Sequence, residues 1–326
     1  SSKVARQRPV RLFLSGPAAG VIGAQMVGDS AGITDIISVD IGGTSSDIAL
    51  IRAGEPLIRP EGLVAGYTIR VPMVDVNAIG SGGGSIAWID GAGGLRVGPH
   101  SAGSEPGPAC YARGGGEATV TDASIVLGYL DPDYFAGGTL QLDPALSFKV
   151  ISEKIAKPLN LTVEQAAMGI HRVVNTQMTE GIRLVSIRQG YDPREFALLP
   201  LGGAGGIHAA ALASELGIRR ILIARHPGVL SAAGLLSAAI EHEASSAFAR
   251  PIDDMSLTDL RAPLADLDRR CADLMRTENV PADDVEIRYF ADVCYVGQSH
   301  YLEIPLTLGG DVGSALYDAF REAHNR

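Results

Sequence analysis

The sequence predicts an α/β fold with a smaller α+β part at its C-terminal end, on three observations. Two short β-branched runs flank a glycine-containing turn near residue 42, and a third apolar run leads near residue 200 through a glycine-rich turn into a helix. Between them, a long segment has apolar residues at helical spacing. With 326 residues, 46% hydrophobic and 20% charged, the chain is long enough for a large core and two subdomains.

The runs that flank the first turn are Asp35–Val39 and Ile48–Ile51. Both are short and β-branched, so we expect two buried strands. The segment that joins them, Asp40–Asp47, is too short for a helical crossover. The two strands are therefore predicted to form an antiparallel hairpin.

The turn of this hairpin has the composition of a phosphate-binding site. Gly42 and Gly43 carry no Cβ and let the backbone come close to a ligand, and successive amides up to Ser45 can form a concave anion nest. Asp40 and Asp47 would repel a bare phosphate but suit one that carries Mg2+. This chemistry fits a nucleoside triphosphate, and the site is not of the Walker type because no Gly-Lys-Ser/Thr follows. The alternative is a hairpin whose glycines only make a tight turn.

The third run, Phe196–Leu201, is predicted to be a strand. Gly202–His208 follows it, then a helix over Ala209–Leu216 that ends at Gly217, and then a strand over Arg220–Ala224. A glycine-rich turn between a strand and a helix places backbone amides and a helix N-terminus beside a ligand. As a dinucleotide fingerprint the turn is weak, because a third glycine is missing at the required spacing.

One helix is predicted before these segments in the sequence, and another between the first hairpin and the third run. One covers about Ala18–Gly28, and a longer one opens with the capping box Thr162–Gln165 and runs to about Arg188. His171 lies on the buried stripe of the longer helix, where we expect a packed histidine rather than a ligand. The segment Arg188–Arg194 is predicted to be the capped turn that follows.

A last subdomain is expected from Glu241 onward. Its alternating polarity predicts a sheet with one face in water. The expected elements are helices over Ser256–Thr277 and Gly313–His324, and strands over Val285–Phe290 and His300–Ile304.

The region Val71–Thr121 is rich in glycine and poor in charge. Flexible linkers have a similar glycine content, but they lack the interleaved Ile, Trp, Val and Cys that this region contains. We therefore expect ordered, hairpin-rich structure that wraps a site.

Composition excludes several function classes. The net charge of −10 disfavours nucleic acid as a partner. The longest weakly polar stretch, Gly228–Ile240, is too short to span a bilayer. Three cysteines without a C-x-x-C pair predict free thiols and a reducing compartment, which we take to be the cytoplasm.

These segments also resemble a known family. Asp40–Asp47 followed by Gly202–His208 resembles the second phosphate motif and the adenosine motif of the superfamily of actin, sugar kinases and heat-shock chaperones. Further segments resemble, more specifically, the A subunit of the hydantoinase/oxoprolinase family: Ser15–Gly20, Val71–Asp75, Gly82–Ala87, Ser101–Tyr111, Thr119–Ala123, Arg188–Arg194, Pro227–Ser231 and Tyr295–Gln298.

The resemblance implies an actin-like ATPase lobe of the ribonuclease H-like type over residues 1–240, with residues 71–121 as a glycine-rich β insertion. Residues 241–326 would then begin a C-terminal α+β subdomain. Family members start with an Asp-Ile-Gly-Gly-Thr-Phe-Thr-Asp segment, the first phosphate motif, which does not occur before Asp40. We therefore expect a central piece of a longer subunit that binds ATP weakly and is inactive alone.

The resemblance also implies site residues and cofactors. Asp40 would be catalytic, and ATP with Mg2+ would be bound. The implied nucleotide-binding residues are Gly42, Gly43, Thr44, Ser45, Ser46, Asp47, Gly202, Gly203, Gly205, Gly206 and His208.

The implied function is that of an ATP-dependent cyclic amidohydrolase subunit, which phosphorylates the amide oxygen of a hydantoin, 5-oxoproline or lactam ring so that water can open it. A B-type hydantoinase subunit would be its partner, and neither nucleic acid nor a membrane is expected as one. Two alternatives stay open. One is a subunit of an ATP-dependent ketone carboxylase of the acetone carboxylase type, and the other is a non-catalytic lobe.

A second divalent metal is a further candidate. Asp75 and Cys110 lie in the glycine-rich region together with Asn77, His100 and Asp122, and residues of these types can bind metals. The family usually has a histidine where Asn77 stands, and asparagine is a poor zinc ligand. The alternative is that Cys110 is only a small buried residue.

Overall fold

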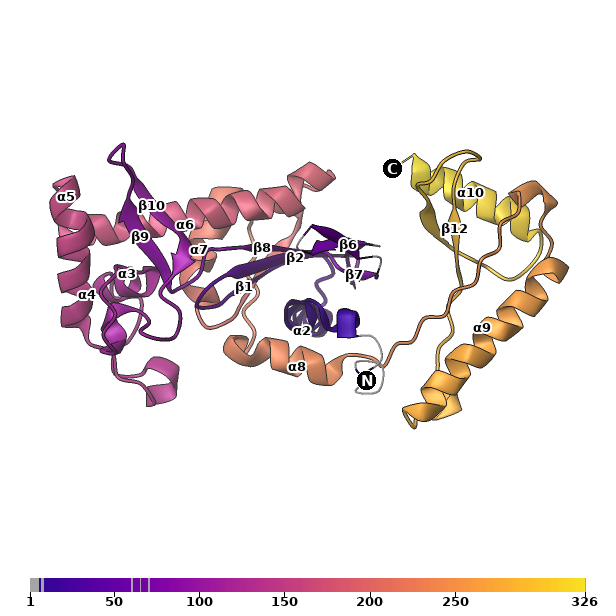
Figure 1. The fold of residues 1–326 in the computed structure, drawn as a ribbon, viewed down its shortest axis with the longest axis horizontal. Coiled ribbons are helices and arrows are strands. Elements are labelled where there is room, and N and C mark those ends of the chain that lie inside the picture. The colour runs from indigo at the N-terminus through magenta and orange to yellow at the C-terminus, as the bar shows by residue number, and fades with distance from the viewer. Residues whose placement is uncertain (1–5, 7–8, 60, 65, 70, 326) are drawn as a thin grey trace. The chain divides into compact units, whose positions relative to one another are not determined.

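A computed structural model describes residues 6, 9–59, 61–64, 66–69 and 71–325 (Figure 1). Contacts divide the chain into two compact units, one that runs to Ala238 and one from Ala239 onward. Each unit has its own buried core. The first unit contains all the residues implied in nucleotide binding.

A mixed sheet forms the centre of the first unit. Strands β1 (Ile36–Ile41) and β2 (Ser46–Arg52) are antiparallel, with Ile37 opposite Leu50 and Asp40 opposite Asp47. Strand β11 (Ala197–Leu201) is parallel to β1 on its other side. The predicted hairpin and the predicted α/β class are confirmed. The edges are completed by β3 (Glu55–Pro56) and β8 (Val76–Ile79), which both pair with β2.

The predicted strand over Arg220–Ala224 is wrong as a strand. Only Ile221 forms a bridge, to Leu198 of β11. The backbone touches β11 through the bonds Leu198 N–H to Arg220 O (2.9 Å) and Leu222 N–H to Leu198 O (2.8 Å), and then turns away. The apolar run in this segment therefore contributes a single bridge at the edge of the sheet.

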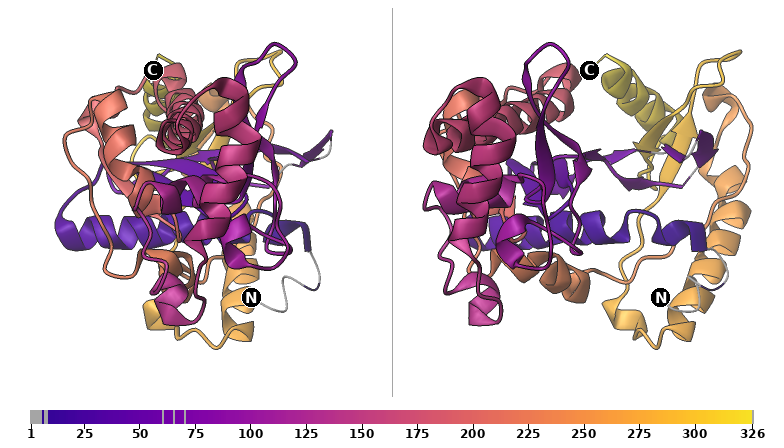
Figure 2. Two further views of the ribbon diagram at one scale, coloured as in Figure 1. Left: turned by 90° about the vertical axis from the view of Figure 1, so that its left-hand side faces the viewer. Right: turned by 60° about the vertical axis from the view of Figure 1, so that its left-hand side comes forward.

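Helices cover both faces of the sheet, which lies between α2 and α6 (Figure 2). On one face α6 (Val163–Val185) and α7 (Gly205–Leu216) bury Val39, Ile48 and Leu198. On the other face α2 (Ser15–Ala31) and α8 (Leu230–Ser237) bury Ile36, Ile51 and Leu199. Both faces of β1 and β2 are thus apolar, as their continuous runs predicted.

The boundaries of these helices differ from expectation at one or both ends. Helix α2 extends three residues further at each end than predicted, and α6 ends at Val185, where a 3-10 turn over Ile187–Gln189 follows. The capping box at Thr162 and Gln165 is present as predicted. Helix α7 begins at Gly205, inside the glycine-rich segment.

The region Val71–Thr121 has defined secondary structure, as predicted. It contains β7 (Met73–Val74), β8, β9 (Ser85–Ile89) and β10 (Leu95–Ser101), and it leads into α3 (Val120–Val126). Ala87, Val97 and Ala118 are buried in the core beside α6. The flexible-linker alternative is therefore excluded. Three short strands precede it in the described chain: β4 (Ile58–Arg59), which pairs with β7, and β5 (Gly62–Val64), which pairs with β6 (Tyr67–Ile69).

Three helices between Thr119 and Leu161 were not anticipated. Besides α3 they are α4 (Pro144–Ile151), which Asp143 caps, and the short α5 (Lys157–Leu159). A π-helical turn over Ser152–Ala156 joins α4 to α5, so the two form one continuous helical segment. Helix α3 has only 7 residues, so helical periodicity has little length in which to show there.

The second unit contains α9 (Leu257–Thr277), a two-stranded sheet and α10 (Val312–His324). The helices agree with prediction to within one residue at each end. The strand predicted over Val285–Phe290 is misplaced, because β12 covers Phe290–Val293 and pairs antiparallel with β13 (Leu302–Pro305). Val293 and Ile304 pack with α10, and the alternating residues of both strands are exposed or half-buried.

Two composition-based expectations can be compared with the structure. All three cysteines are free, as predicted. Within the described chain, no helix has the length and apolar character needed to cross a membrane.

Candidate functional site

The candidate site lies where the carboxyl ends of two neighbouring parallel strands meet. Asp40 of β1 is in register with Leu201 of β11, so the turn after β1 and the turn after β11 leave the sheet side by side. In open α/β sheets, the space outside the carboxyl ends of parallel strands is where ligands bind. The structure therefore brings together the two glycine-rich segments that lie about 160 residues apart in the sequence.

Asp40 is half-buried at this edge and has a partner that the sequence motifs did not identify. The Ser231 hydroxyl of α8 donates a hydrogen bond of 3.0 Å to Asp40 Oδ2. Burial raises the pKa of Asp40, and the bond from Ser231 opposes that rise. Asp47 lies opposite, and burial together with the charge of Asp40 raises its pKa as well. The pair is therefore two carboxylates that a divalent cation would stabilise.

The turn between these carboxylates is open to solvent. Gly42, Gly43 and Thr44 are exposed, and Gly42 N–H donates to Ser45 O at 3.1 Å to close the turn. Ser46 differs from its neighbours, because it is buried and its hydroxyl donates to the carbonyl of Ser81. The hydroxyl of Ser46 therefore serves the fold, and any nucleotide contact from this position would come from its backbone.

A second layer of glycines supports the turn from behind. Gly83 N–H donates to Gly42 O at 3.0 Å and Gly84 N–H donates to Gly43 O at 2.6 Å. A Cβ on Gly82 would lie 2.7 Å from Gly42 O, and one on Gly84 would lie 2.8 Å from Gly43 O. Because backbone touches backbone here, side chains are excluded. This stacking explains the triplet Gly82–Gly84 in the glycine-rich region.

The triplet is held in turn by α3. The backbone N–H and the hydroxyl of Thr121 donate to Gly83 O at 2.7 and 2.8 Å. The first turn of α3 is capped by Thr119 and Asp122. The structure thus gives the Thr119–Ala123 motif a supporting role one layer behind the turn. The sequence singles out Thr119–Ala123 as a motif, but nothing in its residues indicates that Thr121 contacts Gly83.

The turn after β11 approaches Asp40 closely. Gly202 has φ +80°, and a side chain there would collide with Asp40 Oδ1 and the carbonyl of Ile41. Gly205 is buried against Pro200, whereas Gly203 and Gly206 are exposed with open space around them. Helix α7 begins here with no side-chain cap at its N-terminus. Its first amides and the positive end of its dipole are therefore available to an anion.

His208 occupies a different position from the other implied nucleotide-binding residues. Its ring is buried between α7 and α6, where Nδ1 lies 2.7 Å from Asn175 Oδ1. It stacks on His171 with ring centroids 5.1 Å apart. Burial lowers the pKa of His208 to about 3 and that of His171 to about 4, so both rings are neutral. His171 is packed as expected, and the ring of His208 is packed with it.

The structure gives no support to a metal held by Asp75 and Cys110. Asp75 pairs with Arg59 at 2.6 Å and accepts a bond from Gln189 at 3.1 Å. Cys110 is buried, its N–H donates to Asp122 Oδ1 at 2.9 Å, and burial raises the pKa of its thiol. No group of three or more His, Cys, Asp or Glu suitable for a metal occurs among the described residues.

A cavity of the first unit lies away from this sheet edge. It has a volume of about 470 Å³ and is lined by the capped turn Gly190–Arg194 and by Arg183 and Glu215. Asp192 caps that turn and pairs with Arg194 at 2.6 Å, which agrees with the predicted structural role. None of the residues implied in nucleotide binding lines this cavity.

Known proteins resemble this chain over most of its length. The caprolactamase alpha subunit of Pseudomonas jessenii is 39% identical over 327 residues, which cover 98% of this chain and 47% of that protein. The acetone carboxylase beta subunit of Xanthobacter autotrophicus is 32% identical over 97% of this chain and 45% of its own length. The 5-oxoprolinase of Saccharomyces cerevisiae is 38% identical over 72% of this chain and 19% of its own.

Two solved structures also resemble this chain. A nucleotide-free acetone carboxylase structure superposes with a TM-score of 0.80 at 31% identity, over 95% of this chain and 46% of that one. An ATP-dependent caprolactamase from Pseudomonas jessenii superposes with a TM-score of 0.78 at 39% identity, over 95% and 45%.

The chain spans about half the length of these two relatives. The hydantoinase/oxoprolinase family matches residues 1–244, about three quarters of the sequence. The motifs that suggested this family therefore identified it correctly, and the chain belongs to the hydantoinase/oxoprolinase family.

Proposed function

We propose that residues 1–240 form the ATP-binding lobe of an ATP-dependent enzyme and that Asp40 is its catalytic carboxylate. The observation that carries this proposal is the meeting of three features at one sheet edge. They are the half-buried pair Asp40 and Asp47, the exposed turn Gly42–Ser45 and the uncapped N-terminus of α7. Together they offer carboxylates for a metal and amides for phosphate oxygens.

The residues present fit Mg2+ and ATP. Asp40 and Asp47 face each other with raised pKa values, so a bound cation would favour their charged forms. The amides of Gly43 to Ser45 would bind phosphate oxygens, and the open sides of Gly203 and Gly206 would admit the adenosine. ATP would supply the phosphoryl group that turns an amide oxygen into a leaving group. Ser231 would hold the Asp40 carboxylate in one orientation.

We further propose a ring amide as the substrate. An unstrained amide resists water, and phosphorylation of its oxygen makes the carbon electrophilic. Two relatives are named for such rings: a caprolactamase subunit, 39% identical to this chain, and a 5-oxoprolinase, 38% identical. A small cyclic amide is therefore the substrate class that the comparisons favour.

Ketone carboxylation is the second candidate. The acetone carboxylase structure superposes as well as the caprolactamase structure does, with TM-scores of 0.80 and 0.78. The same nucleotide site would then phosphorylate an enol oxygen. A carboxylase relative, the acetophenone carboxylase gamma subunit of Aromatoleum aromaticum, is 41% identical over 63% of this chain. We keep the ring amide first because the caprolactamase subunit is 39% identical over 98% of the chain, against 32% over 97% for the acetone carboxylase subunit.

A companion subunit of the B type would complete the enzyme. The related caprolactamase and acetone carboxylase chains are each named as one subunit of a larger protein. The free thiols favour a reducing compartment such as the cytoplasm as the place of work.

Calorimetric titration of the chain with ATP and Mg2+, with and without its companion subunit, tests the proposal. We expect binding that Asp40→Asn weakens, and turnover only in the complex. The complex is then assayed with caprolactam, 5-oxoproline and hydantoin, and separately with acetone and bicarbonate. Ring opening supports the first candidate, and bicarbonate incorporation supports the second. Absence of nucleotide binding by the complex would refute the proposal as a whole.

A further inference from the structure

We infer that Gln177 is a positioning residue that fixes the glycine turn of the site, an inference that rests on the proposed ATP-binding function. Gln177 lies in the middle of α6, contacts neither carboxylate, and belongs to no motif that the family resemblance singled out. Its side chain links two segments of the glycine-rich region to the helix that covers the sheet.

Both ends of the Gln177 amide are used. Oε1 accepts a bond of 2.7 Å from the hydroxyl of Ser81, and Nε2 donates one of 2.9 Å to the carbonyl of Val97. Ser81 and Val97 are buried and Gln177 is half-buried. A side chain of the same length with either end changed would leave a buried polar atom without its partner.

The Ser81 end leads directly to the turn. The carbonyl of Ser81 accepts the bond from Ser46, the first residue of β2. The next residues, Gly82–Gly84, form the layer whose amides bind the carbonyls of Gly42 and Gly43. Gln177 is therefore separated from the exposed turn by one backbone layer. Displacement of Ser81 would move both the start of β2 and that layer.

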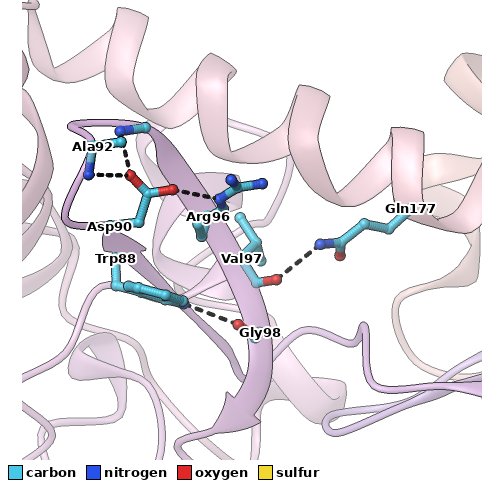
Figure 3. Close-up of polar contacts among 8 residues, drawn as sticks. Trp88, Asp90, Ala92, Arg96, Val97, Gly98 and Gln177 are labelled. Carbon is cyan, nitrogen blue, oxygen red and sulfur yellow. Dashed lines mark hydrogen bonds and ion pairs between the residues drawn. The ribbon is translucent and has the colours of Figure 1, made fainter.

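The Val97 end is attached to a braced hairpin (Figure 3). At its tip, Asp90 Oδ1 accepts the N–H groups of Ala92 and Gly94 at 3.0 and 2.8 Å, and Oδ2 accepts Arg96 Nε at 2.8 Å. Trp88 Nε1 donates to the Gly98 carbonyl at 2.9 Å. These bonds join β9 and β10 independently of Gln177. Because the hairpin is held by its own bonds, the bond to Val97 fixes the Gln177 side chain in the position from which it binds Ser81.

Glycine-rich segments depend more than other segments on stabilising contacts of this kind. Glycine loses more backbone freedom on ordering than any other residue. If Gly82–Gly84 were mobile, the turn would be competent for binding only part of the time, and the apparent Kd would be the intrinsic Kd divided by the competent fraction. Gln177 removes this cost before the ligand arrives.

The test compares Gln177→Leu with a matched control, Gln25→Leu. Gln25 is a half-buried glutamine on α2 whose Nε2 donates to the carbonyl of Gly54 at 2.7 Å, at the other end of β2 from the turn. In the full chain with its companion subunit, Gln177→Leu should raise the Kd for Mg-ATP about fivefold to tenfold, the equivalent of one lost hydrogen bond. Gln25→Leu should lower the Tm about as much as Gln177→Leu does, and it should leave the Kd for Mg-ATP unchanged.

Amide hydrogen exchange provides a measurement that needs no nucleotide. Exchange at Gly42–Ser45 and Gly82–Gly84 should be faster in Gln177→Leu than in the unmodified chain, and unchanged there in Gln25→Leu. Ser81→Ala, which removes the same bond from its other side, should reproduce the effect, and the double variant should add little to it. Equal exchange in both glutamine variants would overturn the inference. Failure of the unmodified complex to bind ATP would instead overturn the proposed function.

Discussion

The hydroxyl of Ser231 donates a hydrogen bond of 3.0 Å to the carboxylate of Asp40, although 191 positions of sequence separate the two residues. The bond joins α8, on one face of the sheet, to the carboxyl end of β1. It connects two motifs, Asp40–Asp47 and Pro227–Ser231, that the sequence shows only as separate segments. The orientation and the proton affinity of the central carboxylate therefore depend on a helix outside the turn.

Replacement of Ser231 by alanine should lower ATP turnover roughly tenfold or more, since a hydrogen bond to a charged group contributes about 1.5–3 kcal/mol. The bond from Ser231 lowers the pKa of Asp40, so its loss should raise that pKa further. The acid limb of the kcat/KM profile should consequently move to higher pH. Ser237→Ala, at the exposed last residue of the same helix, is the control and should leave the profile unchanged. A profile that does not move would contradict the assigned contact.

Replacement of Asp40 by asparagine should abolish turnover without loss of the fold. Burial raises the pKa of Asp40 in the folded state, so the stability linked to its protonation is lost as pH rises through that pKa. At pH 7 the charged carboxylate is thus a destabilising group, and the variant should melt at the same or a higher temperature. The difference in Tm should shrink as the pH falls towards the pKa of the unfolded chain. Thermal unfolding at both pH values measures this, and a large loss of Tm at pH 7 would argue against it.

Two glycines of the turn after β11 should respond oppositely to alanine. Gly202→Ala places a Cβ at φ +80° against Asp40 and Ile41, which should cost about 3 kcal/mol or more of folding stability. Gly203→Ala adds a Cβ to open space, so its Tm should be unchanged while its affinity for ATP falls. Denaturant unfolding and calorimetry separate the two effects. Equal stability losses would show that the second glycine belongs to the fold and not to the site.

Cys110 and Cys294 should differ in reactivity towards thiol reagents. Cys110 is buried and burial raises the pKa of its thiol, whereas Cys294 is exposed. Since the thiolate is the reactive form, native protein should be labelled rapidly at Cys294 and at Cys110 only after unfolding. Mass spectrometry of iodoacetamide-treated protein identifies the sites. Rapid native labelling of Cys110 would restore it as a candidate ligand.

The local residue pattern was sufficient to predict the hairpin at the centre of the sheet. The β-branched runs on either side of Asp40–Asp47 predict the hairpin because nothing in so short a connection allows another arrangement. The carboxylates and the open glycines follow from the same eight residues. Asp40 and its turn could therefore be named as a candidate site before their surroundings were known.

Contacts between segments far apart in the sequence could not be predicted from the local residue pattern. No property of Ser231 or Gln177 in the sequence shows that either bonds near the turn, because each does so across one or more other elements. His208 was assigned by its place in a motif, while its ring is turned into the layer beside α6. The strand expected at Val285 failed for a related reason: alternation predicts exposure on one face but not where pairing with β13 begins.

The stacking of the buried triplet Gly82–Gly84 on Gly42 and Gly43 makes a wall of main chain behind the turn. Main-chain amides and carbonyls are the same whatever residues carry them, so substitution can break this wall but cannot give it a new preference. Chemical diversity in such a molecule must arise elsewhere, on surfaces built from side chains. Under the proposed function, a change of acceptor from a ring amide to a ketone would need no change in how the phosphates are held, and one phosphorylating unit could serve enzymes that finish different reactions.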